Sequence, residues 1–155
     1  MKTSQEQAVA EIRALGGEVI TDENLPDKPV ISVKLAGNKV TDAGLAPLKA
    51  INQLEQLTLF DTQVTDAGFE QLRELTYLRR LDLSFTPVTN AGLQHLQGLA
   101  QLQYLDLRNT AVTDAGLECL KGLPQLEKLL LWHTKVTAVG VRDLQKALPQ
   151  AKILR

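Results

Sequence analysis

The chain has 155 residues, with 17 basic and 18 acidic residues and a single cysteine, Cys119. This balance lacks the basic excess typical of nucleic-acid or anionic-membrane binding, so we expect neither kind of partner. One cysteine excludes an intrachain disulfide and a zinc site built from several thiolates. No apolar run approaches the roughly 18 residues that a membrane helix needs, and no apolar signal core opens the chain. We expect a cytoplasmic location by default, or a secreted or periplasmic one if a signal peptide was removed.

The first segment, residues 1–29, is predicted to cover the N-terminal end of the fold. Ser4 with Gln7 resembles a capping box, apolar residues follow at helical spacing, and two glycines then end the pattern. These features predict a helix near residues 4–15. A short strand is expected at residues 18–21, followed by a proline-containing loop.

One hexapeptide then recurs throughout the chain. VTDAGL begins at Val40, and near copies follow every 24 residues, starting at Val64, Val88, Val112 and Val136. A fixed period between 20 and 50 residues is typical of a stacked solenoid.

Each repeat changes its hydrophobic spacing once. Leu57 and Leu59 are two residues apart, which places both side chains on one face of a short strand. Leu45, Leu48 and Ile51 are three apart, which indicates one face of a helix. The repeat is therefore predicted to be a strand, a turn and a helix, and six strand positions are expected, the last near Ile153.

The hexapeptide lies where strand turns to helix. Its Thr-Asp pair is predicted to cap the first helical N–H groups, and its glycine to allow close packing between repeats. A second recurring position is expected to supply hydrogen bonds inside a buried turn. It is occupied by Asn38, Thr62, Thr86, Thr110 and Thr134.

The motif LxxLxLxxTxVTDAGL, as in residues 54–64 and their continuation, resembles a leucine-rich repeat. It is similar to the cysteine-containing subclass and to bacterial proteins with Thr where the common pattern has Asn or Cys. The resemblance implies an α/β solenoid, or horseshoe, with parallel strands on the concave face and helices on the convex face. We expect one domain, 1–155, with regular repeats over 30–135. Residues 136–155, which depart from the hexapeptide and gain one residue, are expected to form a C-terminal capping repeat.

The residues before, between and just after the strand leucines are predicted to line the exposed concave face, where such solenoids usually bind. Four of the six aromatic residues fall there, and exposed aromatics with nearby arginines are typical of interaction hot spots. The alternative is that they only tile the sheet surface. The predicted partner-binding residues are Phe60, Arg80, Asp82, Phe85, Tyr104, Asp106, Arg108, Trp132 and His133.

Two acidic residues on this face, Asp82 and Asp106, are expected to lie side by side on neighbouring strands, with Arg80 and Arg108 placed to compensate them in a mesh of ion pairs. The alternative is a charged patch that faces a ligand. Two carboxylates without further ligands make a poor metal site, so we expect no metal and no cofactor.

No catalytic constellation is evident. His133 and His95 are expected on opposite sides of the solenoid, and no nucleophile and orienting carboxylate share a column with either.

The leading hypothesis is therefore a non-enzymatic, monomeric protein-recognition module that binds a protein partner through its concave face. The resemblance to the cysteine-containing subclass suggests a second possibility, a substrate receptor of a ubiquitin-ligase-like complex. An enzyme with an unrecognised site and a purely structural or engineered scaffold are the remaining alternatives.

Overall fold

The computed structural model describes residues 4–155, and its strands form one sheet whose order follows the sequence. The seven strands are β1 (Glu18–Thr21), β2 (Val30–Lys34), β3 (Gln56–Thr58), β4 (Arg80–Asp82), β5 (Tyr104–Asp106), β6 (Lys128–Leu130) and β7 (Lys152–Leu154). All neighbouring pairs are parallel except β1 with β2, which is antiparallel. The sheet therefore has one strand more than the six that the leucine pattern predicts, because the predicted strand at residues 18–21 joins its edge.

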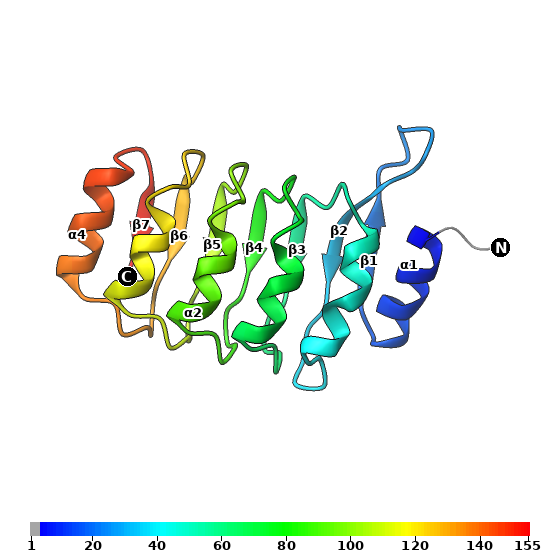
Figure 1. The fold of residues 1–155 in the computed structure, drawn as a ribbon, viewed down its shortest axis with the longest axis horizontal. Helices are drawn as coiled ribbons and strands as arrows, with labels where there is room; N and C mark the ends of the chain where they lie inside the picture. The colour runs from blue at the N-terminus through cyan, green and yellow to red at the C-terminus, as the bar shows by residue number, and fades with distance from the viewer. Residues whose placement is uncertain (1–3) are drawn as a thin grey trace.

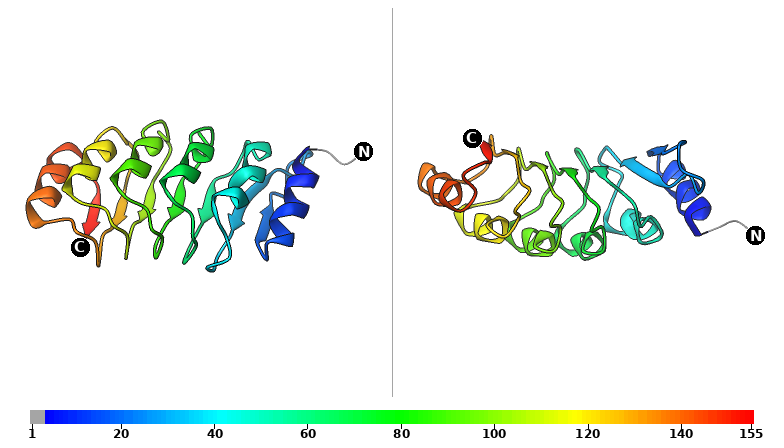
Figure 2. Two further views of the ribbon diagram at one scale, coloured as in Figure 1. Left: turned by 60° about the horizontal axis from the view of Figure 1, so that its bottom comes forward. Right: turned by 90° about the horizontal axis from the view of Figure 1, so that it is seen from above.

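Helical segments cover one face of this sheet (Figure 1). Seen from above, they follow the outer side of a shallow arc, with the strands on the inner side (Figure 2). This is the predicted solenoid, with strands on the concave side and helices on the convex side. The helical segments are α1 (Ser4–Ala14), η1 (Asp42–Ala50), η2 (Asp66–Leu72), α2 (Asn90–Leu93), η3 (Gln94–Leu96), α3 (Asp114–Leu117), η4 (Glu118–Leu120) and α4 (Ala138–Ala147).

The N-terminal segment folds as the sequence predicts, within one residue at the end of its helix. Helix α1 buries Ala8 and Ile12 and ends at Ala14. Gly16 follows with φ +80, a left-handed conformation that glycine adopts without steric cost. Leu15, which continues the apolar spacing, is 43% exposed because it lies beyond the last helical turn.

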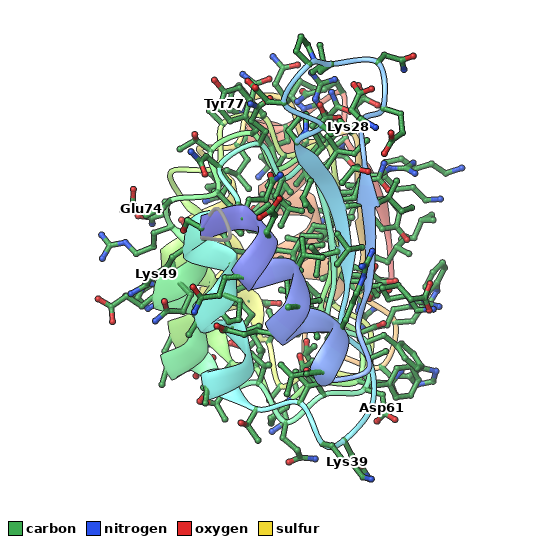
Figure 3. The ribbon with its side chains drawn as sticks, turned by 90° about the vertical axis from the view of Figure 1, so that its right-hand side faces the viewer. Lys28, Lys39, Lys49, Asp61, Glu74 and Tyr77 are labelled. Carbon is green, nitrogen blue, oxygen red and sulfur yellow. The ribbon has the colours of Figure 1, made fainter. Side chains whose placement is uncertain are left out.

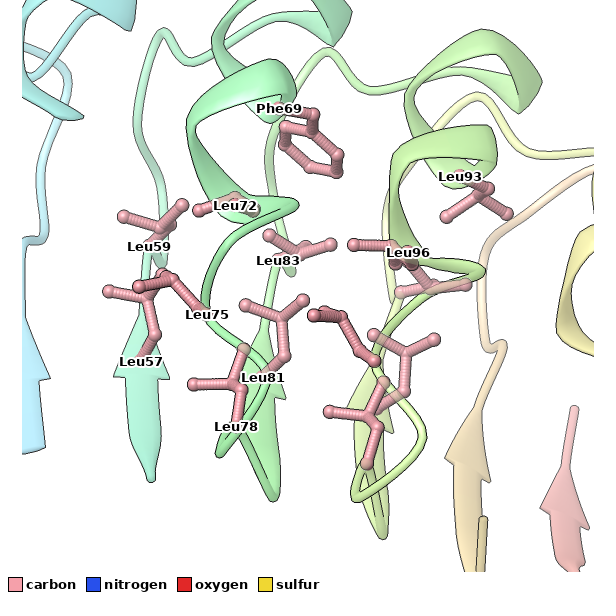
Figure 4. Close-up of a cluster of buried hydrophobic side chains, with 14 of the residues drawn as sticks. Leu57, Leu59, Phe69, Leu72, Leu75, Leu78, Leu81, Leu83, Leu93 and Leu96 are labelled. Atoms are coloured by element: carbon pink, nitrogen blue, oxygen red, sulfur yellow. The ribbon is translucent and has the colours of Figure 1, made fainter. Parts of the chain in front are cut away.

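The core lies between the sheet and the helices, and the repeat supplies it in register. Leu57, Leu81 and Leu105 are direct partners on successive strands. Their side chains and the helix leucines form one buried cluster, in which Phe69 takes the place of a repeat leucine (Figure 4). This apolar burial stabilises the solenoid mainly through contacts between neighbouring repeats.

Four of the predicted repeat helices are 3₁₀ in whole or in part. Segments η1 and η2 are 3₁₀ throughout, whereas the next two repeats begin with four α-helical residues and end as η3 and η4. An apolar residue at every third position matches the 3.0 residues per turn of a 3₁₀ helix, in which positions i and i+3 align.

The last repeat shows why. Its extra residue lengthens the last buried interval from three residues, as in Leu120 to Leu123, to four, from Leu144 to Leu148, and here a regular α-helix of 10 residues forms.

The acidic residue of the hexapeptide joins one repeat to the next. Asp66 Oδ1 accepts from the backbone N–H of Thr89 at 2.8 Å, and Asp66 Oδ2 accepts from the Thr89 hydroxyl at 2.6 Å. Asp42 binds Thr65 in the same way, and Asp114 binds Thr137. The predicted capping role of this Asp is therefore wrong, because its carboxylate points to the following repeat.

Asn90 takes the same place in the third copy. Its Oδ1 accepts from the Thr113 N–H at 2.9 Å, and its Nδ2 donates to the Thr113 hydroxyl at 2.8 Å. The predicted capping by Thr is observed at three copies: Thr65, Thr89 and Thr137 each accept from an N–H of their own helix. Thr41 and Thr113 make no cap bond, and the Thr113 hydroxyl accepts from the Asn90 amide instead.

The hexapeptide glycine makes room for this inter-repeat bond. A Cβ on Gly92 would lie 2.5 Å from Asp66 Oδ1 and 3.2 Å from the ring of Phe69. Gly68, Gly116 and Gly140 lie against the Asp or Asn of the preceding repeat in the same way. Gly44 differs, because its nearest neighbours are aliphatic carbons at 3.3 and 3.4 Å.

The recurring threonines satisfy the buried turn, as predicted. Thr62, Thr86, Thr110 and Thr134 each donate their hydroxyl to the carbonyl oxygen of the second strand leucine, three residues earlier. Asn38, at the same position in the first repeat, is exposed instead.

Candidate binding surface on the strand face

The parallel register arranges the outward side chains of β2–β7 in columns, which together we call the strand face. The first column, at the start of the strands, contains Ser32, Gln56, Arg80, Tyr104, Lys128 and Lys152. The second, between the strand leucines, contains Lys34, Thr58, Asp82, Asp106, Leu130 and Leu154. The loop that follows each strand adds the aromatic residues.

Tyr104 lies at the centre of the first column between two cations. The Arg80 guanidinium lies 5.5 Å from the ring centroid, and the Lys128 ammonium lies 5.7 Å from it. Both distances are within the range of a cation–π attraction. Burial raises the pKa of the Tyr104 hydroxyl, and the Asp106 and Asp82 carboxylates raise it further. Tyr104 is therefore a neutral O–H donor at physiological pH.

Asp106 is buried beneath Arg108. The Arg108 Nε lies 2.9 Å from both carboxylate oxygens and Nη2 lies 2.6 Å from Oδ2, a bidentate geometry, while the Arg108 backbone N–H donates to Oδ1. Hydrogen bonding to Asp106 raises the pKa of Arg108. Asp106 is 0% exposed, so the prediction that it lines the accessible surface is wrong. Its role on this face is to hold the Arg108 side chain, which is 38% exposed.

Asp82 has different partners from those predicted. Its Oδ1 accepts from the Ser84 hydroxyl at 2.6 Å and from the Ser84 backbone N–H at 2.9 Å. Arg80 turns to Tyr104 instead, so the predicted ion-pair mesh reduces to the pair of Asp106 with Arg108. A shallow hollow of about 360 Å³ opens beside these groups. It is lined by Gln56, Leu57, Thr58, Arg80, Leu81, Asp82 and Tyr104.

Aromatic side chains gather where the strands end. Phe60 and Phe85 are 41% and 46% exposed, and their ring centroids lie 5.3 Å apart in an edge-to-face arrangement. Trp132, which occupies the position of Phe60 in a later repeat, is 39% exposed. We call these three residues the aromatic rim. The exposed His133 follows Trp132 directly, so this predicted site residue also lies at the strand ends.

Phe85 occupies a backbone conformation that suits it poorly. Gly37, Asp61, Phe85, Asn109 and His133 take the same place in successive repeats, and all have φ between 54 and 96. Glycine, Asn, Asp and His tolerate this left-handed region best, whereas a bulky residue there is an outlier that costs roughly 1 kcal/mol. The conformation is built into the repeat, because it directs the N–H of Phe85 to the Arg108 carbonyl at 2.9 Å.

Lys128 and Lys152 belong to this surface, although neither was among the predicted site residues. The signal that identifies them is the 24-residue register, which places both in the column of Arg80. The predicted placement of His95 on the helical side is confirmed, and Cys119 is half-buried on that side.

Residues 4–155 contain no cluster of His, Cys, Asp and Glu suited to a metal ion. Within that range no helix is long and apolar enough to span a bilayer.

This architecture, one strand and one short helix per 24 residues with an inward leucine pair, defines the fold of leucine-rich-repeat proteins. A family model for the leucine-rich repeat matches residues 76–136. These residues are leucine-rich repeats by sequence, and the chain as a whole has the leucine-rich-repeat fold. No curated protein matches the sequence significantly.

Two solved structures show the same fold at low sequence identity. An internalin from Listeria monocytogenes is similar with a TM-score of 0.59 and 17% identity, over 96% of this chain and 54% of the internalin. The leucine-rich-repeat ectodomain of the receptor kinase SOBIR1 from Arabidopsis thaliana gives a TM-score of 0.63 and 16% identity, over 99% of this chain and 92% of that chain. The chain therefore spans about half of the internalin and most of the plant ectodomain.

Proposed function

We propose that the chain is a non-enzymatic protein-recognition module and that its partner binds the strand face. Leucine-rich-repeat proteins commonly bind other proteins. The proposal places the contact on the aromatic rim and on the side chains around Tyr104.

The observation that supports this proposal most directly is Phe85. It is a half-exposed aromatic residue in a left-handed conformation, at a position where the other four repeats have Gly, Asp, Asn or His. In the isolated chain the edge-to-face contact with Phe60 offsets that strain, but almost half of Phe85 stays exposed. Contact with a partner would bury the rest of the ring, and buried aromatic residues dominate binding energy at interfaces.

Affinity capture with matched variants tests the proposal. The bait that should lose its partner is a double variant, Phe85→Asn with Trp132→Ala. The control is Tyr77→Ala, because Tyr77 is also an exposed aromatic residue, at 58%. It lies at the opposite edge of the solenoid from Asp61, the neighbour of Phe60 in the aromatic rim (Figure 3).

We expect proteins from the native cell extract that bind the unaltered chain and the Tyr77 variant but not the double variant. A purely structural scaffold would give no such difference. A partner retained equally by all three baits would show that the contact lies elsewhere, and the proposal would be withdrawn.

A further inference from the structure

The strand face has two chemically different sides. Where the strands begin, the first column presents Arg80, Lys128 and Lys152 with no acidic residue among its six members. Where the strands end, the aromatic rim presents Phe60, Phe85 and Trp132. A partner that covers the whole face must therefore match positive charge on one side and apolar surface on the other.

Arg80, Tyr104 and Lys128, on three neighbouring strands, bring two cations and one hydroxyl donor together. The two cations flank one tyrosine ring at 5.5 and 5.7 Å, and the neutral tyrosine hydroxyl adds a third donor. Charge-assisted hydrogen bonds from such donors to a carboxylate are about twice as strong as neutral ones.

The acidic residues nearby leave this positive charge largely unpaired. Asp106 is paired with Arg108 in bidentate geometry, and Asp82 Oδ1 accepts two bonds from Ser84. Asp82 alone lines the hollow beside Arg80 with a negative group. An incoming carboxylate beside Tyr104 would therefore meet the Arg80 and Lys128 cations and two anions, Asp106 and Asp82, which are already bound by Arg108 and Ser84.

Phe60 and Phe85 form the matching apolar contact. Their edge-to-face pair leaves more than two fifths of each residue exposed, at 41% and 46%. Exposed aromatic pairs of this kind cover an apolar side chain of a partner without reorganising, because each is already held by the other.

We propose that the strand face binds a protein segment that presents a carboxylate to Arg80, Tyr104 and Lys128 and an apolar side chain to Phe60 and Phe85. This inference rests on the proposed function and specifies the chemistry of the partner. Phe85 lies five positions after Arg80 in the turn beyond β4, so the roughly 16 Å of a fully extended chain is an upper limit for their separation. In an extended segment the acidic and the apolar residue are then at most about five positions apart.

Selection from a random 12-residue peptide library displayed on phage tests this inference with the whole chain as the target. We expect selected peptides to combine Asp or Glu with Phe, Leu or Trp at the stated spacing. Their affinity should fall at least tenfold in the charge-reversal variant Arg80→Glu with Lys128→Glu, and should weaken as salt rises. Phe85→Asn should reduce affinity similarly while the salt dependence stays the same.

The matched control for charge is Lys49→Glu with Arg73→Glu, two exposed cations on the helical side of the repeats, where Figure 3 labels Lys49. It changes the net charge of the chain equally and should leave binding unaltered. Peptides that lose affinity in the Phe85 variant but lack acidic residues, or that ignore charge reversal at Arg80 and Lys128, would overturn the inference and leave the proposed function standing. Peptides insensitive to every strand-face variant would overturn both.

Discussion

The turn that enters each helix and the face formed by the strands follow opposite rules, although the same 24-residue repeat builds both. At the turn, the residue types hardly vary: Asp or Asn of one repeat binds Thr of the next, and a glycine makes room for the bond. On the strand face, equivalent positions vary far more, as Gln56, Arg80, Tyr104 and Lys128 show, although Asp82 matches Asp106 and Lys128 matches Lys152.

This difference separates stability from recognition. The turn fixes the distance between repeats, so any change there propagates to a neighbour through a specific bond. The strand face carries few bonds that the fold needs, apart from the pair of Asp106 with Arg108. Substitutions at the turn should therefore change the free energy of unfolding, whereas substitutions on the face should change binding alone.

The largest expected effect is that of Gly92→Ala. A methyl group there would collide with Asp66 Oδ1 at 2.5 Å, and the ring of Phe69 and the Val88 side chain, at 3.2 and 3.3 Å, leave no direction for relief. We expect a loss of about 2 kcal/mol in the free energy of unfolding, the usual cost of overpacking. Urea denaturation followed by circular dichroism measures it.

Gly44→Ala is the matched control within the same hexapeptide. Its closest neighbour is the end of the flexible Leu15 side chain at 3.3 Å, and alanine is the better helix former by about 1 kcal/mol. We expect stability within about 1 kcal/mol of the unaltered chain, by the same propensity argument. Equal losses at both glycines would mean that glycine is needed for its backbone freedom and that the inter-repeat bond is incidental.

The bond itself is tested at Asp66. Replacing it with alanine removes two acceptors from Thr89, and we expect a loss of roughly 1.5 kcal/mol, typical of hydrogen bonds to a charged group. Asp66→Asn should lose less than half as much, because Asn90 shows that an amide can bind the following threonine. If the two variants unfold at the same urea concentration, the carboxylate acts through its charge and the hydrogen-bond geometry is secondary.

We expect a smaller loss in the free energy of unfolding when the pH is lowered. Hydrogen bonds from Thr137 hold the pKa of Asp114 below its ordinary value of 3.8. Because the folded-state pKa is the lower one, this contribution is complete above pH 3.8 and is lost as the pH falls through the folded-state value.

Carboxyl NMR titration should show Asp114 titrating below its ordinary value, and Thr137→Ala should return it toward that value. A titration that Thr137→Ala leaves unmoved would assign the shift to some other neighbour.

The solenoid and its inward leucines could be predicted from the sequence because they depend on spacing alone. The paired leucines at Leu57 and Leu59 fix the strand, and the register then places every other repeat. The 3₁₀ geometry was readable only in part: a strict spacing of three suits a 3₁₀ helix, but the repeats with α2 and α3 have the same spacing and begin as α-helix. The role of the hexapeptide Asp could not be predicted. Its position in the sequence points to a cap on the helix that follows it, whereas its bond is to a threonine 23 positions away in the next repeat.

The sequence predicted which residues lie on the candidate surface, but two details of that prediction were wrong. Columns of residues follow from the register, so Phe60, Tyr104 and Trp132 lie where expected. Asp106 is buried because the bidentate Arg108 covers it, and such a choice of side-chain partner cannot be read from alternation along a strand. Arg80 had two candidate partners, Asp82 on its own strand and Tyr104 on the next, and its guanidinium lies over the Tyr104 ring.

The smallest expected change in stability is at Phe85, where the comparison between turn and face is sharpest. Phe85→Asn loses the edge-to-face contact with Phe60, worth about 1 kcal/mol. It also removes the strain of a bulky residue in a left-handed conformation, which costs about as much and which Asn tolerates, as Asn109 does in the next repeat. These effects oppose each other, so the midpoint of urea unfolding should stay nearly unchanged while binding at the strand face is lost. A fall in stability as large as that expected for Gly92→Ala would mean that Phe85 supports the fold, and the distinction between the two regions would then fail at the residue on which it depends most.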